Sequence, residues 1–202
     1  MSDHDDFTTV RLDGTQMRAL AHPLRARLLG ALRLDGPATA TTLARALDTN
    51  TGATSYHLRR LADVGLVVEE DRPDAGGRER WWRAAHDFSD FSARDFEGDP
   101  DAAAAHDWFQ RWAARKAFDG FEAWLDAAPA DTADWRDAAG PGDLKLHIGP
   151  DRLRALTDEV WALLERYERE APADEPDARE VIVATLVYPR VDSARREPGP
   201  PA

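Results

Sequence analysis

The chain of 202 residues contains no cysteine, so disulfide bonds, thiolate metal sites and a thiol nucleophile are all excluded. It also lacks any run of eighteen apolar residues, and we expect no membrane-spanning helix. The first ten residues, MSDHDDFTTV, are acidic and lack the apolar stretch that a secretory signal needs. Together these absences predict a cytoplasmic protein.

The motifs of common catalytic and metal centres are missing as well. No HExxH, GxSxG, Walker or Rossmann fingerprint occurs, so we assign no catalytic residue and predict that the protein is not an enzyme. The six histidines never stand three or four residues apart, the spacing that puts two ligands on one helix face. We therefore expect no metal and no cofactor. The alternative is a site shared between two copies, from His106 with Asp101 or Asp107.

Basic charge is scarce overall, because the formal net charge is -12. The deficit is uneven along the chain. Residues 14–86 hold 11 arginines and 8 acidic residues, a balance of +3, whereas residues 1–13 and 87–202 carry -3 and -12. Since phosphate repels carboxylates, the acidic part is expected to face away from any nucleic acid.

The most informative pattern begins after residue 36. A short helix starts at the capping residue Thr39, a tight turn follows at 48–50, and a second helix runs from about Thr51 to Val64. The expected inward face of this second helix is Thr54, Leu58, Leu61 and Val64. Its opposite face is polar.

A glycine and two β-prone segments complete this pattern. Gly65 provides the left-handed residue that ends many helices. Residues 66–68 and 78–83 then flank a turn rich in Asp, Gly and Arg. The whole order predicts a helix-turn-helix with a β-wing, which presents one helix to the major groove of DNA and a basic ribbon to its backbone.

The remaining pattern predicts a fold that is mainly α with small β elements. The expected elements are an edge strand at 8–12, helices beginning at Thr15 and Pro23, a helix at 101–128, a loop at 129–142, a strand at 144–148, a helix from about 150 to 170 and a strand at 180–188. The expected division is an N-terminal arm (1–13), a winged helix-turn-helix domain (14–88), a linker (89–100), a C-terminal α+β domain (101–190) and a flexible tail (191–202). The C-terminal domain is the candidate for dimerisation and for effector binding.

Four ordered pieces of the sequence resemble the ArsR-type winged-helix repressors. They are AHPLR at 21–25, the apolar helix at 43–47, SYHL at 55–58 with Leu61, and GLV at 65–67. The resemblance implies a homodimeric, sequence-specific DNA-binding transcriptional regulator that acts as a repressor. The chain extends well beyond the part that the small metal sensors contain, which indicates a larger member with an extra C-terminal domain.

The resemblance places the base-facing side chains on the exposed face of the second helix. They fall on Thr51, Gly52, Ser55 and Tyr56, with Arg59 beyond them. Gly52 offers no side-chain hydrogen bond and Tyr56 replaces a common histidine, so the operator sequence does not transfer from relatives. The full set of predicted DNA-binding residues adds Thr49, Asn50, Arg60, Arg78, Arg80 and Arg83. His57 is expected to pack against the core and support this helix rather than contact a base. His22 is expected to make a structural hydrogen bond.

Aromatic side chains gather on the helix expected at 101–128. The set is Trp108, Trp112, Phe118, Phe121 and Trp124. We interpret it as core or as a dimer interface in preference to an effector pocket, because aromatic residues dominate interface cores. Two other functions stay open: a winged helix that binds a protein instead of DNA, and a small-molecule-binding protein that uses the aromatic helix.

Overall fold

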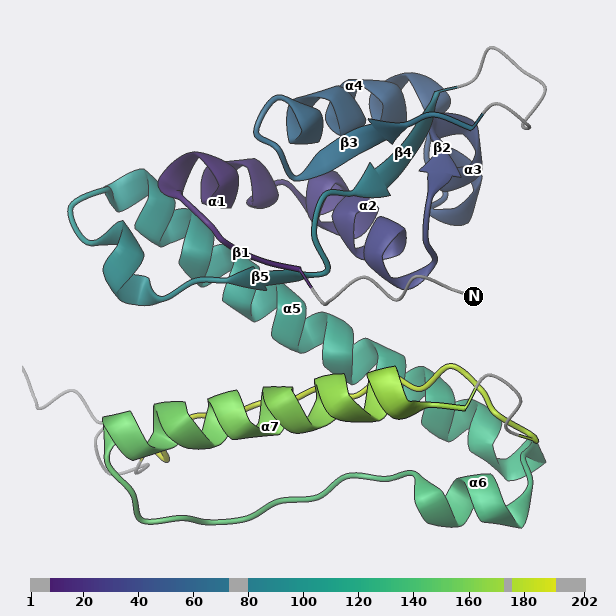
Figure 1. The fold of residues 1–202 in the computed structure, drawn as a ribbon, viewed down its shortest axis with the longest axis vertical. Helices are drawn as coiled ribbons and strands as arrows, with labels where there is room; N and C mark the ends of the chain where they lie inside the picture. Colours follow the sequence, from purple (N-terminus) through teal and green to yellow (C-terminus); the bar gives the residue numbers. More distant parts are fainter. Residues whose placement is uncertain (1–7, 73–79, 173–175, 192–202) are drawn as a thin grey trace, which may run out of the picture. The chain divides into compact units, whose positions relative to one another are not determined.

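The computed structural model describes residues 8–72, 80–172 and 176–191. The chain forms two compact units, residues 1–116 and 117–202. Most of the described elements are helices, so the prediction of a mainly α fold with small β elements is confirmed (Figure 1). Among the described residues, no helix combines the length and the apolar character required to cross a bilayer.

The N-terminal unit contains the predicted helix-turn-helix (Figure 1). Its helices are α1 (Gly14–Leu20), α2 (Pro23–Leu34), α3 (Ala40–Ala46), α4 (Thr51–Ala62) and the first part of α5 (Pro100–Ala127). A turn at residues 47–50 joins α3 to α4, and Asp48 adopts a positive φ of 49° there. Gly65 has φ 72°, so the left-handed glycine expected after the second helix is confirmed.

Side-chain caps determine where these helices begin. The Asp13 carboxylate accepts a hydrogen bond from the Gln16 backbone N–H, and the Gln16 side chain accepts one from Asp13, which is a capping box. The hydroxyl of Thr39 caps α3, as predicted, and the side chain of Asn50 caps α4. His22 caps α2, because its Nδ1 accepts a hydrogen bond from the Leu24 N–H at 3.2 Å. The structural role expected for His22 is therefore confirmed.

Two small sheets lie in the same unit. The strands are β1 (Thr9–Arg11), β2 (Ala38–Thr39), β3 (Val67–Glu70), β4 (Trp81–Ala84) and β5 (Phe88–Asp90). β1 pairs parallel to β5, whereas β4 lies between β2 and β3 in an antiparallel sheet that forms the wing. The edge strand and the wing were predicted. β2 was missed, because two residues are too short for a periodic signal.

The core of the N-terminal unit lies between the helices and the wing. Met17, Leu28, Leu58, Leu61 and Leu66 are all 0% exposed. Leu58 and Leu61 stand three residues apart on the inward face of α4. Leu28 and Leu32 stand four apart on that of α2. The rigid platform under α4 therefore comes from leucine packing.

The structure differs from the linker predicted over 89–100. Residues 88–90 form β5, and Phe96, in the 3-10 helix η2 (Ala93–Phe96), is only 1% exposed. The rings of Phe91 and Phe109 meet edge to face at 5.7 Å, so the start of α5 belongs to the same core. The division between the units falls within α5, at residues 116 and 117. The polar composition of 89–100 concealed two aromatic anchors, Phe91 and Phe96.

The C-terminal unit contains α6 (Ala133–Ala138) and α7 (Pro150–Glu170), besides the end of α5 and the 3-10 helix η3 (Ala128–Ala130). α7 begins where the sequence predicted a helix. The loop predicted at 129–142 is partly wrong, because Thr132 caps α6 there. The strands predicted at 144–148 and 180–188 form no ladder in the described residues and are drawn as plain tubes in Figure 1. Their β-prone composition supplies no partner for the backbone, and a strand needs one.

Candidate nucleic-acid interface

The outward face of α4 is exposed and polar. Thr51, Gly52, Tyr56 and Arg59 are exposed, and Ser55 is half-buried. Tyr56, with 54% of its surface exposed, is the largest of these side chains. The opposite face is sealed, since Thr54, Leu58 and Leu61 are 0% exposed. The predicted inward face is confirmed at Thr54, Leu58 and Leu61, whereas Val64 lies beyond the end of α4 and is half-buried.

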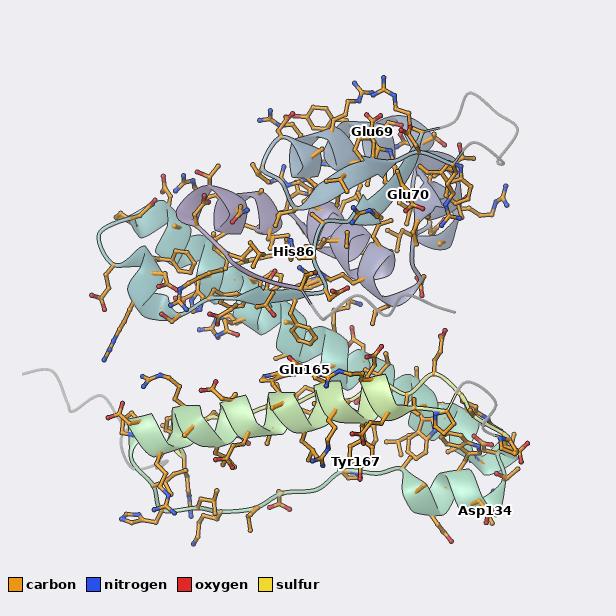
Figure 2. The ribbon with its side chains drawn as sticks, in the orientation of Figure 1. Glu69, Glu70, His86, Asp134, Glu165 and Tyr167 are labelled. Atoms are coloured by element: carbon orange, nitrogen blue, oxygen red, sulfur yellow. The ribbon has the colours of Figure 1, made fainter. Side chains whose placement is uncertain are left out.

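The wing lies beside the beginning of α4. Arg80 stands just before β4, and its guanidinium forms an ion pair with Glu69 of β3 at 2.7 Å. Figure 2 labels Glu69 and its neighbour Glu70 on this strand. On the other side of the wing, the guanidinium of Arg72 lies over the Trp81 ring, 4.7 Å from its centre. The wing thus carries both signs of charge.

A groove of about 520 Å³ joins the wing to α4. Four predicted DNA-binding residues line it, namely Thr51, Ser55, Arg59 and Arg80. The other lining residues are Thr39, Ala40, Thr41 and Trp82. Thr39 and Thr41 were missed as site residues. The sequence indicated only that Thr39 caps the helix that follows it, and nothing in it indicated that either side chain lines a groove. The pairing of Thr39 with Trp81 across β2 and β4 brings this turn to the groove.

The groove combines two sources of positive potential. Its arginines supply formal charge, and the first turn of α4 points its unpaired backbone N–H groups outward. Asn50 satisfies one of these donors, that of Ala53, at 2.8 Å. A phosphate oxygen is the acceptor that suits the remaining donors.

The other predicted DNA-binding residues lie around this groove. Thr49 and Asn50 form the turn before α4. Arg60 pairs with Asp63 at 3.3 Å, and Arg83 donates to the Ala84 carbonyl at 3.2 Å. Arg78 falls within 73–79, outside the described residues.

Two histidines meet between α2 and α4. The rings of His22 and His57 stand 4.2 Å apart, between the N-terminus of α2 and the middle of α4. Burial lowers the pKa of both imidazoles, and the positive charge of Arg25 lowers each further. His57 is half-buried and its Nδ1 is buried without a hydrogen-bond partner in the described residues, which agrees with the packing role predicted for it.

The aromatic set on α5 falls into two stacked pairs. The rings of Trp108 and Trp112 lie 6.1 Å apart, and those of Phe121 and Trp124 lie 5.6 Å apart. Phe118 between them is 58% exposed. The assignment of this set to an interface or an effector site stays a prediction. His106, the candidate ligand of a shared metal site, contacts the rings of Phe91 and Phe96, and the described ranges contain no cluster of three possible ligands.

Comparison with known proteins agrees with this geometry. Residues 20–70 match the family described as "Helix-turn-helix domain". No curated protein matches the chain.

Several solved structures are similar to parts of the chain. A possible ArsR-family transcriptional regulator from Mycobacterium bovis, a homodimeric DNA-binding domain, is 27% identical over 35% of this chain and 61% of its own, with TM-score 0.31. A possible transcriptional regulator for arsenical resistance is 30% identical over 59% of this chain and 97% of its own, with TM-score 0.31. Reduced HlyU from Vibrio cholerae is 19% identical over 48% and 84%, with TM-score 0.31. The chain thus spans less than two thirds of the first of these structures.

The family match covers α2, β2, α3, α4 and β3, so it includes the groove residues of β2, α3 and α4 but not Arg80 and Trp82. The family match confirms the helix-turn-helix on which the predicted resemblance to ArsR-type winged-helix regulators rests. Residues 20–70 of this chain are thus similar to the helix-turn-helix domain family.

Proposed function

We propose that the protein is a homodimeric, sequence-specific DNA-binding repressor that places α4 of each copy in a major groove. One observation carries this proposal. The polar face of α4 is open to solvent and adjoins a groove in which Arg59, Arg80 and the helix N-terminus converge. Apolar packing on the opposite face holds this helix in place.

The contacts divide into two kinds. Arg59 and Arg80 are exposed cations at the mouth of the groove and are assigned to phosphates. Thr51, Ser55 and Tyr56 are assigned to base edges, where hydroxyl groups donate or accept hydrogen bonds. A twofold dimer then requires a pseudo-palindromic operator with half-sites about 34–36 Å apart.

The first experiment is selection of bound DNA from a random pool with the full chain, followed by anisotropy measurements on the selected sequence. We expect sub-micromolar binding that weakens steeply with added salt, because phosphate contacts release counterions. Binding that shows no dependence on sequence or on salt contradicts the proposal.

Matched variants then separate the two kinds of contact. Arg59→Ala should weaken all sequences alike and reduce the salt slope by about one. Arg94→Ala removes the same charge from an exposed position on η2 and should leave binding unchanged. Tyr56→Ala should instead alter the preferred sequence. Repression is measured separately, as the decrease in transcription from a template that carries the selected site within its promoter.

The acidic end of β3 favours a second candidate function. Glu69, Glu70 and Asp71 follow one another in the wing, where carboxylates repel phosphate. A winged helix of this charge suits a basic partner protein. Light scattering with DNA and with basic proteins from the same cells separates the two functions, since only the regulator forms a salt-sensitive complex with selected DNA.

A further inference from the structure

The segment from Val181 to Tyr188 is apolar on both faces and exposed on both. Val181, Ile182 and Val183 are 62%, 70% and 54% exposed, and Val187 and Tyr188 are 53% and 78% exposed. A strand that is apolar on both faces is typical of a sheet interior. Among the described residues, the backbone of this segment takes part in no ladder and in no recorded backbone hydrogen bond.

We propose that this segment pairs antiparallel with the same segment of a second copy, with Thr185 opposite Thr185 on the twofold axis. The inference rests on the homodimer of the proposed function and assigns its interface. Pairing between identical strands is self-complementary, because each residue meets the same partner in both copies. It gives the exposed N–H and C=O groups the partners that they lack.

Charge complementarity selects this register. Residues 181–189 are uncharged, and Glu180 and Arg190 stand at their two ends. Pairing about Thr185 puts Glu180 of one copy opposite Arg190 of the other, at both ends of the ladder. Opposite charges in directly facing positions stabilise a sheet, whereas like charges destabilise it.

Proline placement agrees with the same register. Hydrogen-bonded and non-hydrogen-bonded pairs alternate along an antiparallel ladder. If the central threonines form a non-hydrogen-bonded pair, Pro189 faces Val181 in another such pair. Its missing N–H then removes no ladder hydrogen bond, which is where a strand tolerates proline. Val183 meets Val187 in the pair between them, and β-branched neighbours suit a pleated surface.

The absence of cysteine makes a direct test available, since the twin is the only other protein thiol that a single introduced cysteine can meet in the dimer. Thr185→Cys places two sulfurs across a pair whose Cα atoms stand about 4.5 Å apart, within disulfide range. Val183→Cys is the matched control, because the offset of four residues puts its twin roughly 14 Å away. Both full-length variants are oxidised with oxidised glutathione and resolved on a non-reducing gel.

We expect a reducible covalent dimer from Thr185→Cys and at least tenfold less from Val183→Cys. Equal cross-linking of the two, or none from Thr185→Cys, overturns the proposal. If residues 180–188 instead pair with residues 144–148 of the same chain, Thr185→Cys forms no covalent dimer.

Charge reversal provides a second measurement that needs no thiol. Glu180→Arg should weaken dimerisation in sedimentation by roughly tenfold, because it faces Arg190 at both ends. The double variant Glu180→Arg, Arg190→Glu should restore it, and failure of this rescue also overturns the register. A dimer that cross-links at Thr185 but binds no selected DNA refutes the proposed function alone. A chain that binds DNA without cross-linking refutes only this interface.

Discussion

The two units of the chain bury their apolar residues to very different extents. In the N-terminal unit, leucines and methionine reach 0% exposure, and side chains cap the helices. In the C-terminal unit, α7 has no buried residue and the segment 180–188 is largely exposed. The first unit buries its apolar side chains and caps its helices within one copy. The second has exposed apolar surface, of the kind that often marks an interaction site.

The largest expected effect on stability comes from a substitution in the core of the N-terminal unit. Leu58→Ala should lower the free energy of unfolding by about 3–5 kcal/mol, because it leaves a cavity under α4. Leu144→Ala, at a position 82% exposed, should change it by less than about 0.5 kcal/mol. Chemical denaturation followed by circular dichroism measures both. Equal effects would mean that the two units are packed alike.

Low pH is expected to destabilise the N-terminal unit through its buried and half-buried histidines. Burial and the nearby Arg33 lower the pKa of His86 to about 4. The unfolded chain takes up this proton below about pH 6.5 and the folded chain only near pH 4, so stability is complete above 6.5 and falls as the pH drops. The loss between these values should approach about 3 kcal/mol. The lowered pKa values of His22 and His57 act in the same direction.

Denaturation curves taken at several pH values test the origin of this loss. His86→Gln should flatten the dependence between pH 6.5 and 4. His147→Gln, at an exposed position of the C-terminal unit, should leave it as it is. A slope that survives in the first variant would assign the effect to other groups. Asp87, Asp95 and Asp99 have lowered pKa values, so their contribution is lost only below about pH 4.

A smaller effect is expected at the start of α4. Asn50→Ala removes the cap on Ala53 and should cost about 1 kcal/mol of stability. Thr132→Ala removes the cap of α6, whose hydrogen bond is longer at 3.4 Å, and should cost less. Thermal unfolding of the two variants gives the comparison. If Thr132 proves the more costly, α6 is held more firmly than its exposure implies.

The smallest effect concerns the wing. Glu69→Gln removes the ion pair with Arg80, and both side chains are more than half exposed, so stability should change by less than about 0.5 kcal/mol. Affinity for the selected DNA should nevertheless rise, because Arg80 no longer has a competing carboxylate. Asp90→Asn, which removes the ion pair between Asp90 and Arg11, is the control within the same unit, because Arg11 is not among the predicted DNA contacts. Unchanged affinity in Glu69→Gln would remove Arg80 from the proposed contact set.

Prediction from sequence succeeded where one local pattern determined one local structure. The cap at Thr39, the inward face of α4 and the left-handed Gly65 were all readable, because each depends on neighbours within four residues. It failed at residues 89–100, whose polar composition hid the anchors Phe91 and Phe96. Their partners in α5 lie 10 to 18 residues away.

The candidate site shows the same limit. Arg59, Ser55 and Thr51 were placed on one face by helical spacing alone. Thr39 and Thr41 join them only because β2 pairs with β4 across more than forty residues of chain. No spacing in the sequence reports such a pairing.

Hydrophobic spacing and capping chemistry by themselves determined that this chain carries a helix-turn-helix with a wing, because helices and turns are governed by contacts between near neighbours. Only the tertiary structure decided which residues surround the groove and which β-prone segments find a partner. Both depend on where distant parts of the backbone come together, and a strand is completed only by a neighbour that its own composition does not specify.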